Sequence, residues 1–434
     1  MSPRILLVSF ISAIALLGAC GSSEEPTEAV NGLHADEDQS EAQLTNGAPS
    51  ASGAALLSDG ALPEGQAALL ELAFAAPSKL PLDPHVKNRA RGQETVILAA
   101  LETQQFALAY RLAQEVPNWR KGSALADLAH ALLEQDASAD VLWLLDEAME
   151  VAMAPAAEVV DQNWRRDRIR AKVAGVYLKL GLDEEAQKAA AGVEASEAIH
   201  FEQAFAPRLS AEEVDQQLEA VPTLLQSASF EQAVSILTNL AIIYENHYED
   251  VERRERTKQV LRDEWSKVPA LVHIDLTLRM ARAAIAADDL KNARALCEDA
   301  RAYVSNVTIT PDEYVRLLAR VALVRAEAGA TQDAIDSLDA AMQIYDAERE
   351  KIVDMFRAEV LQPVAEAYLV AGSAEKGAKL YAQAIEEGAL NPNGRPRAID
   401  FAGTLSSMVR SGFTPGAELR ARMDEVFQGL QSPW

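Results

Sequence analysis

The stretch that decides the fold runs from Asn163 to Ala186 and reads NWRRDRIRAKVAGVYLKLGLDEEA. Its opening residues match the tetrapeptide Asn118-Trp119-Arg120-Lys121, which lies 45 residues earlier, except that Arg replaces the Lys. In the same register Ala129 corresponds to Ala174. Similarity at a fixed offset is the sequence signature of stacked supersecondary units, each of which buries its apolar face against the next. The sequence therefore predicts a repeat array.

One unit has Ala174, Tyr177, Gly181 and Ala186 at its pattern positions. Small residues let two antiparallel helices approach closely, Tyr fills the groove between neighbouring units, and Gly adopts the left-handed conformation that ends a helix before a tight turn. This pattern resembles the tetratricopeptide repeat. The resemblance implies an all-α fold, namely a right-handed α-solenoid of helix-turn-helix units whose first helices line a concave face.

The same register returns along the chain from about residue 92 to residue 427. Aromatic residues make up only 6% of the chain, which also favours an all-α class. A tetratricopeptide unit has about 34 residues, so the period expected here, 40–45 residues, is a departure from the family. The step of 67 residues between positions 174 and 241 is expected to contain a degenerate unit between Ala198 and Leu225. Equivalent first-helix positions are 129, 174, 241, 281, 322, 365 and 405, with steps of 45, 67, 40, 41, 43 and 40.

Capping residues and prolines in the sequence also predict a succession of helices. The stretches beginning at Ser210 and Thr310 each predict a capping box at the start of a helix. Thr414-Pro415 is expected to start the last second helix, and Pro363 to kink a first helix or mark its start. Cys297 falls in a second helix, where we expect a small buried apolar side chain rather than a reactive thiol.

The N-terminus reads as a secretory signal over residues 1–19. Arg4 supplies a positive charge, Ile5 to Leu17 is apolar, and the run is too short to span a bilayer. Cys20 directly after Leu17-Gly18-Ala19 resembles the lipobox of bacterial lipoproteins. That resemblance implies that Cys20 carries palmitate and other acyl chains and anchors the protein in the cell envelope. Gly21, by analogy with enterobacterial sorting, favours the outer membrane, with the protein facing the periplasm.

Residues 20–56 are expected to form the lipidated Cys and a disordered acidic tether, and residues 57–434 the solenoid. The tether's only charges are its acidic residues, and the whole chain carries −26. Such a charge argues against nucleic acid as a partner, because binding to phosphates needs clustered Lys and Arg. The tether's seven acids are Glu24, Glu25, Glu28, Asp36, Glu37, Asp38 and Glu41, and leaving these and Arg4 out gives −20 for the body.

Chemical motifs give no basis for catalysis. The chain contains no Walker A loop, no G-x-S-x-G, no H-E-x-x-H and no C-x-x-C. The densest group of potential ligands, Glu245 to Asp250, lies at a predicted helix end, where polar residues are usually solvated. We therefore expect no enzyme, no cofactor and no metal site.

Binding is the expected function. The resemblance places six cations on or beside the concave face, where a line of cations in an acidic body suits the carboxylates of a protein or peptide partner. The alternative is that these cations only pair with acidic residues at helix spacing. A solute- or glycan-binding lipoprotein with a helical pocket is the alternative function, and it predicts exposed aromatic side chains gathered in one cavity. The six cations are Arg168, Lys172, Arg279, Arg282, Arg316 and Arg320.

Overall fold

A computed structural model of the protein describes residues 57–154, 163–194 and 197–434. These residues form α-helices and three short 3₁₀ helices, and no β-strand occurs among them. The all-α class is confirmed. The predicted signal peptide (residues 1–19), the predicted lipidated Cys20 and the predicted tether (residues 20–56) lie outside the described residues.

Most helices are between 12 and 18 residues long and follow one another through short turns. The α-helices are α2 (Gln66–Ser78), α3 (Leu82–Glu102), α4 (Phe106–Gln114), α5 (Arg120–Gln135), α6 (Leu142–Met153), α7 (Asn163–Lys179), α8 (Asp183–Ala190), α9 (Ile199–Phe205), α10 (Ala211–Ser227), α11 (Phe230–Asn246), α12 (Val251–Glu264), α13 (Ala270–Ala286), α14 (Leu290–Asn306), α15 (Pro311–Glu327), α16 (Thr331–Glu348), α17 (Asp354–Val370), α18 (Ala374–Ala389), α19 (Gly394–Arg410) and α20 (Ala417–Gln428). The 3₁₀ helices are η3 (Ala206–Arg208), η4 (Trp265–Lys267) and η5 (Arg349–Lys351).

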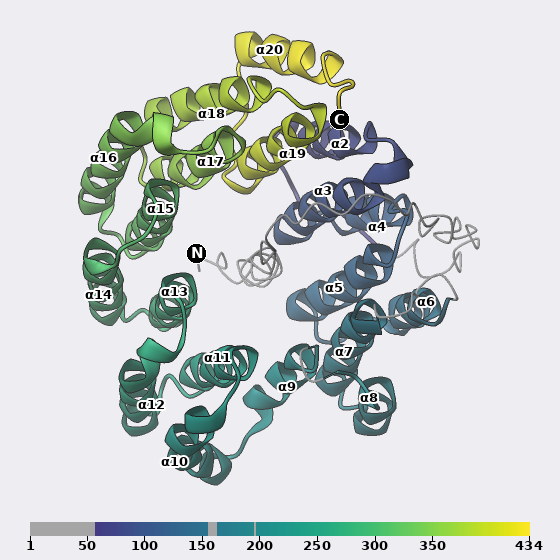
Figure 1. Ribbon diagram of the computed structural model, residues 1–434. Helices are drawn as coiled ribbons and strands as arrows, with labels where there is room; N and C mark the ends of the chain where they lie inside the picture. The colour runs from purple at the N-terminus through teal and green to yellow at the C-terminus, as the bar shows by residue number, and fades with distance from the viewer. Residues whose placement is uncertain (1–56, 155–162, 195–196) are drawn as a thin grey trace, which may run out of the picture.

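The helices lie in two layers around a common centre (Figure 1). An inner layer holds the odd-numbered helices from α3 to α19, and an outer layer holds the even-numbered helices from α4 to α20. Most inner helices pack against the outer helix that follows and against the next inner helix. The apolar core therefore lies between the layers and continues from one pair to the next.

The two ends of the array meet. Helix α19 packs against both α2 and α3, so the helix pairs close into a ring (Figure 1). Across this seam Lys79 donates a hydrogen bond of 2.5 Å to the carbonyl oxygen of Phe427 and lies 3.9 Å from the centroid of its ring. Arg410 of α19 lies 3.6 Å from Glu102 of α3. The packing between neighbouring inner helices therefore continues across the seam from α19 to α3.

A glycine permits the close approach at the seam. A Cβ atom at Gly92 of α3 would lie 2.7 Å from Cδ1 of Ile399 in α19 and 2.7 Å from Cβ of Pro77 in α2. Real Cβ atoms do not approach so closely, and the Pro77 ring cannot swing away. The missing side chain at Gly92 therefore lets three helices from opposite ends of the sequence pack together.

Left-handed residues follow five of the inner helices, namely α7, α13, α15, α17 and α19. Gly181, Gly329, Gly372 and Gly412 have φ values between 69° and 80°. Asp288 takes the same place without glycine, at φ 58°. Each of the five follows by seven residues a fully buried position of its inner helix, namely Ala174, Ala281, Ala322, Ala365 or Leu405.

Two of the finer predictions need correction. Helix α20 begins at Ala417, after Gly416, rather than at Thr414-Pro415. Pro363 lies inside α17, so it does not mark the start of that helix. Both capping boxes are present, at Ser210 and at Thr310. Cys297 is fully buried in α14, and burial raises the pKa of its thiol to about 12.

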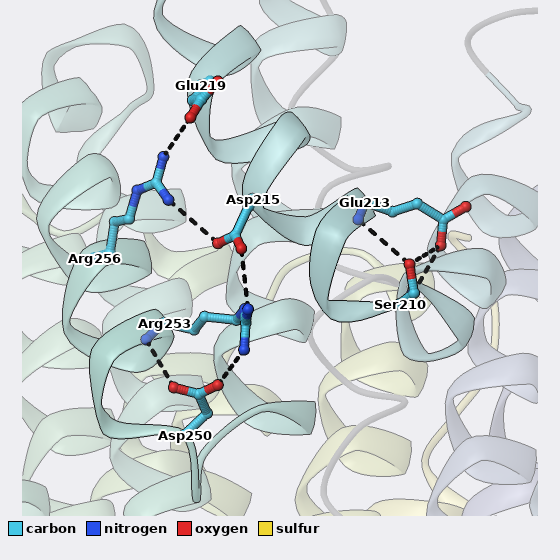
Figure 2. A network of polar contacts seen from close by, with 7 residues as sticks. All are labelled: Ser210, Glu213, Asp215, Glu219, Asp250, Arg253 and Arg256. Atoms are coloured by element: carbon cyan, nitrogen blue, oxygen red, sulfur yellow. Dashed lines mark hydrogen bonds and ion pairs between the residues drawn. The ribbon is translucent and has the colours of Figure 1, made fainter.

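The arc from α9 to α12 is the irregular part of the ring. Its inner helix α9 has only 7 residues, which explains the long step in the repeat register. Figure 2 shows how α12 is fastened to α10 there, with Arg253 joining Asp215 to Asp250 and Arg256 joining Asp215 to Glu219. These ion pairs between outer helices hold the arc where the inner layer is short.

No helix in residues 57–154, 163–194 and 197–434 is both long and apolar enough to cross a membrane.

Candidate ligand-binding cavity

The inner layer surrounds a central cavity of about 4580 Å³. Its wall is made by α3, α5, α7, α11, α13, α15, α17 and α19, and residues from both ends of these helices line it. Because the inner helices stand side by side around the ring, the cavity is the concave face of the array closed upon itself. A ligand held here would touch side chains that are far apart in the sequence.

The structure places all six predicted cations in the wall of this cavity. Each of them is already engaged by an acidic residue. Arg168 pairs with Glu197 at 2.8 Å, Lys172 with Asp127 at 2.7 Å, Arg279 with Glu245 at 2.9 Å, Arg282 with Glu327 at 3.1 Å, Arg316 with Glu359 at 2.8 Å, and Arg320 with Asp275.

These pairs differ from the alternative that the sequence offered. Pairing at helix spacing occurs for Arg316, which also reaches Asp312 at 3.3 Å in its own helix. The main partners instead lie on a neighbouring inner helix, or, for Arg168, in the segment before α9. Arginine side chains are long enough to span the gap between packed helices, and the acidic residue there is held at a fixed height. The cations therefore tie adjacent inner helices together.

The pairs also show that the inner helices run parallel. Arg316, near the start of α15, pairs with Glu359, near the start of α17. Lys179, at the end of α7, pairs with Glu134, near the end of α5. The ring thus has two different edges. We call the edge at the beginnings of the inner helices the N-rim, which includes Phe230, Pro311 and Val353, and the edge at their ends the C-rim, which includes Glu102, Asp288 and Ser411.

The first described residues of the chain attach at the C-rim. Gly60 donates a hydrogen bond of 2.8 Å to the carbonyl of Gln104, and Gln105 donates one of 2.9 Å to the carbonyl of Gly60. The carboxylate of Asp59 accepts from the backbone N–H groups of Ala107 and Leu108 at the start of α4. Gln104 itself lines the cavity, so the chain joins the ring at one mouth of the cavity.

A second group of cations lies where α3, α5 and α7 form the wall. Arg120 and Arg168 have their guanidinium carbons 4.7 and 5.8 Å from the ring centroid of Trp119. Trp119 is buried and packs edge-on against Trp164, with 5.2 Å between ring centroids. The tryptophans at corresponding positions therefore form a structural base for the arginines of the wall.

Sequence reasoning missed Arg91, which lies on the same part of the wall. It is exposed, lines the cavity and has no ion-pair partner within the described part of the chain. The repeat register begins only at about residue 92, so nothing in the sequence placed α3 in the inner layer. Its position follows from α3 packing against both α5 and α19.

His130 and Asp400 are two of the wall residues whose pKa values are shifted. Burial is the main cause that lowers the pKa of His130 to about 4, and the neighbouring Lys179 adds to it. Burial likewise raises the pKa of Asp400 well above its ordinary value, and the charge of Glu359 adds to this, although a hydrogen bond of 2.6 Å from Asn391 opposes it. These two groups lie on different helices, α5 and α19.

Metal and glycan sites have little support in the geometry. Over the described ranges, no group of three or more His, Cys, Asp or Glu side chains is placed to hold a metal ion. The aromatic residues lining the cavity are Phe106, Trp164, Phe230 and Phe356. They belong to α4, α7, α11 and α17, so they are spread around the wall rather than gathered in one pocket.

Comparisons with protein-family models, with curated proteins and with solved structures give no match to this chain.

Proposed function

We propose that this protein is a lipid-anchored lipoprotein of a bacterial envelope that binds a segment of a partner protein inside its central cavity. The observation that carries the proposal is the cavity itself, whose wall is built from inner helices around the whole ring. Concave faces of helical-repeat proteins receive peptides and protein segments. We propose binding rather than catalysis, with no cofactor.

The proposed architecture is a right-handed tetratricopeptide-like solenoid with a period of 40–45 residues, closed into a ring. The constant spacing of seven residues between the buried inner-helix position and the left-handed residue supports a true repeat. The proposed departure from the family is closure, since Gly92 and Ile399 bring the first and last inner helices together.

The cavity suits a polypeptide segment better than a small solute. Its volume of about 4580 Å³ far exceeds the roughly 300–1,000 Å³ of small-molecule pockets. Exposed apolar side chains stand at the N-rim, where Phe230, Val353 and Met355 keep 51%, 54% and 46% of their surface accessible. Apolar contacts at one mouth and polar contacts along the wall fit a protein chain that enters from the N-rim.

The proposed anchor would connect to the ring at the C-rim. If Cys20 carries lipid, the chain runs from the membrane to Leu57, and Asp59 and Gly60 fasten it at the C-rim. The tether therefore joins the ring at the C-rim, and the apolar N-rim is the mouth that it leaves clear. The partner is proposed to enter at the N-rim, from the periplasm.

Affinity capture of the full-length lipidated protein from gently solubilised envelopes tests the proposal. A bulky substitution in the wall, Asn239→Trp on α11, is compared with Lys291→Trp, which lies exposed on the outer helix α14. We expect one stoichiometric partner that Asn239→Trp loses and Lys291→Trp keeps. Capture that is indifferent to Asn239→Trp would contradict binding in the cavity.

A further inference from the structure

One cation stands without an acidic partner where α3, α5 and α7 form the wall of the cavity. Arg91, Arg120 and Arg168 line the cavity together there. Arg120 pairs with Glu94 and Arg168 with Glu197. The other acidic residues of these helices that line the cavity are also paired, Asp127 with Lys172, Glu134 with Lys179 and Glu102 with Arg410. The charge of Arg91 is therefore not compensated among the described residues, and its place on the wall favours a negative group.

Arg91 is the free member of this group. Of the cations that line the cavity, only Arg91 and Arg395 lack an ion-pair partner in residues 57–154, 163–194 and 197–434. Arg91 lies about one helical turn before Glu94 on α3, and Glu94 is the residue that pairs with Arg120. Burial is the main cause that lowers the pKa of Arg120, Glu94 opposes it, and the charges of Arg91 and Arg168 lower it further. The three guanidinium groups thus share one region of the wall.

The paired arginines also keep hydrogen-bond donors in reserve. Arg168 gives Nε and Nη2 to Glu197, and Arg120 gives Nη1 to Glu94. Neither Nη1 of Arg168 nor Nη2 of Arg120 has an acceptor among the described residues. Trp119 packs against both guanidinium groups and limits their rotation. Planar donors held in place in this way suit carboxylates, which accept paired N–H bonds.

We propose that Arg91, Arg120 and Arg168 form a binding site for the carboxylate side chains of an acidic polypeptide segment. This inference rests on the proposed function, and it names the chemistry of the segment that enters the cavity. The site lies on the wall of a cavity that is large enough for an extended chain. Arg91 makes the first contact because it is exposed and unpaired, and the reserve donors of Arg120 and Arg168 complete the site.

One possible source of such a segment is the chain itself. Seven acidic residues lie between Glu24 and Glu41, ahead of the residues that attach at the C-rim. From Glu41 to Leu57 an extended chain can reach about 50 Å, enough to enter the cavity from that rim. The chain's own acidic residues and an acidic partner offer the same chemistry, so the experiment must separate them.

The test measures binding of fluorescein-labelled octaglutamate to the purified full-length protein in detergent, by anisotropy at low ionic strength. We expect Arg91→Gln to weaken binding about twofold to fivefold, as loss of one exposed charge contact does, and added salt to weaken it further. Lys291→Gln, which removes an exposed cation from the outer helix α14, should leave the affinity unchanged. Equal losses in both variants, or no loss in Arg91→Gln, would overturn the site.

Two further arms identify the ligand. Replacing the seven acids between Glu24 and Glu41 by their amides should strengthen octaglutamate binding if the chain's own acids occupy the site, and an unchanged affinity assigns the site to an external segment. Either result keeps the site. Polyphosphate that binds more tightly than octaglutamate, with the same dependence on Arg91, would overturn the carboxylate assignment. If octaglutamate fails to bind while the captured partner still depends on Asn239, this inference fails and the proposed function stands.

Discussion

Arg410 near the end of α19 lies 3.6 Å from Glu102 at the end of α3 and 3.1 Å from Glu366 in α17. One guanidinium group therefore joins the last two inner helices of the array to the first. Comparable ion pairs link most other neighbouring inner helices, such as Lys172 with Asp127. The seam is therefore held by the same kind of ion pair as the other contacts between neighbouring inner helices. For this reason we regard the ring as closed.

Replacing Arg410 by Met should weaken the seam. The side chains of Glu102 and Glu366 are only 7% and 17% exposed, so loss of their cation leaves negative charge in a poorly solvated place. We expect the free energy of unfolding to fall by about 2–3 kcal/mol, somewhat below the loss for a fully buried pair. Urea denaturation followed by circular dichroism gives the value. Arg395→Met serves as the control, because Arg395 is exposed on the same helix and has no partner within the described part of the chain.

Gly92→Ser tests the packing of the seam independently of charge. The new Cβ would meet Ile399 and Pro77 at 2.7 Å, so α3 must move away from α2 and α19. Overpacking of this kind costs about 1–3 kcal/mol. Gly416→Ser is the matched control, since nothing lies within 4 Å of a Cβ there and Ser is a favourable N-cap residue. Small-angle scattering should show an expanded particle for Gly92→Ser alone, and unchanged dimensions and stability would count against a tightly closed ring.

His273 should make the stability depend on pH. Its ring lies between Trp265 and Tyr303, at 4.3 and 4.0 Å between centroids, and its Nδ1 has no hydrogen-bond partner in the described residues. Burial lowers its pKa to about 4, although Asp299 opposes this shift. The folded state thus binds the proton less readily than the unfolded chain, whose His pKa is about 6.5.

It follows that neutral His273 makes its full contribution to the free energy of unfolding above about pH 6.5. This contribution is lost as the pH falls towards about 4. The loss amounts to about 3 kcal/mol at most. Denaturation between pH 7 and pH 4 should show a smaller decline in stability for His273→Phe, which keeps the aromatic stack but cannot ionise. His85→Gln, outside this stack, should follow the wild-type curve. Parallel curves for wild type and His273→Phe would show that His273 charges freely in the folded state.

The proposed lipid anchor is tested with Cys20→Ser. We expect the acyl chains proposed at Cys20 to hold the protein at the membrane. In a detergent phase partition the wild type should enter the detergent phase and Cys20→Ser the aqueous phase. Substitution of the other cysteine, Cys297→Ala, should not alter the partition, because Cys297 is buried in α14. Retention of Cys20→Ser in the detergent phase would mean that the ring itself binds the membrane.

Much of the local structure could be predicted from the sequence. The glycines at 181, 329, 372 and 412 have the left-handed conformation that the repeat pattern requires, and Asp288 takes the same conformation at the corresponding place. The pattern failed at Asp136, which lies 45 residues before Gly181 in the repeat register but has an extended conformation (φ −142°). Local rules work here because each turn is governed by a few neighbouring residues.

Closure could not be predicted in this way. It depends on small rotations added over all the helix pairs, and on contacts such as Lys79 with Phe427, which are 348 residues apart in the sequence. The candidate site likewise combines features that the local sequence predicts with features that only the packing of helices determines. The six cations all line the cavity, but their acidic partners lie mainly on neighbouring inner helices, which no spacing within one helix reveals. Arg91 lay outside the recognised register.

The most direct test of the account is photo-crosslinking in intact cells from single positions of the full-length protein. A photoreactive residue is placed at Asn239 or Leu323, in the wall of the cavity, or at Lys291 or Glu375, exposed on outer helices. We predict crosslinks to one partner protein from the two cavity positions and none from the two outer positions. Crosslinks to a partner from the outer positions only would contradict the claim that the ring binds its partner in the central cavity.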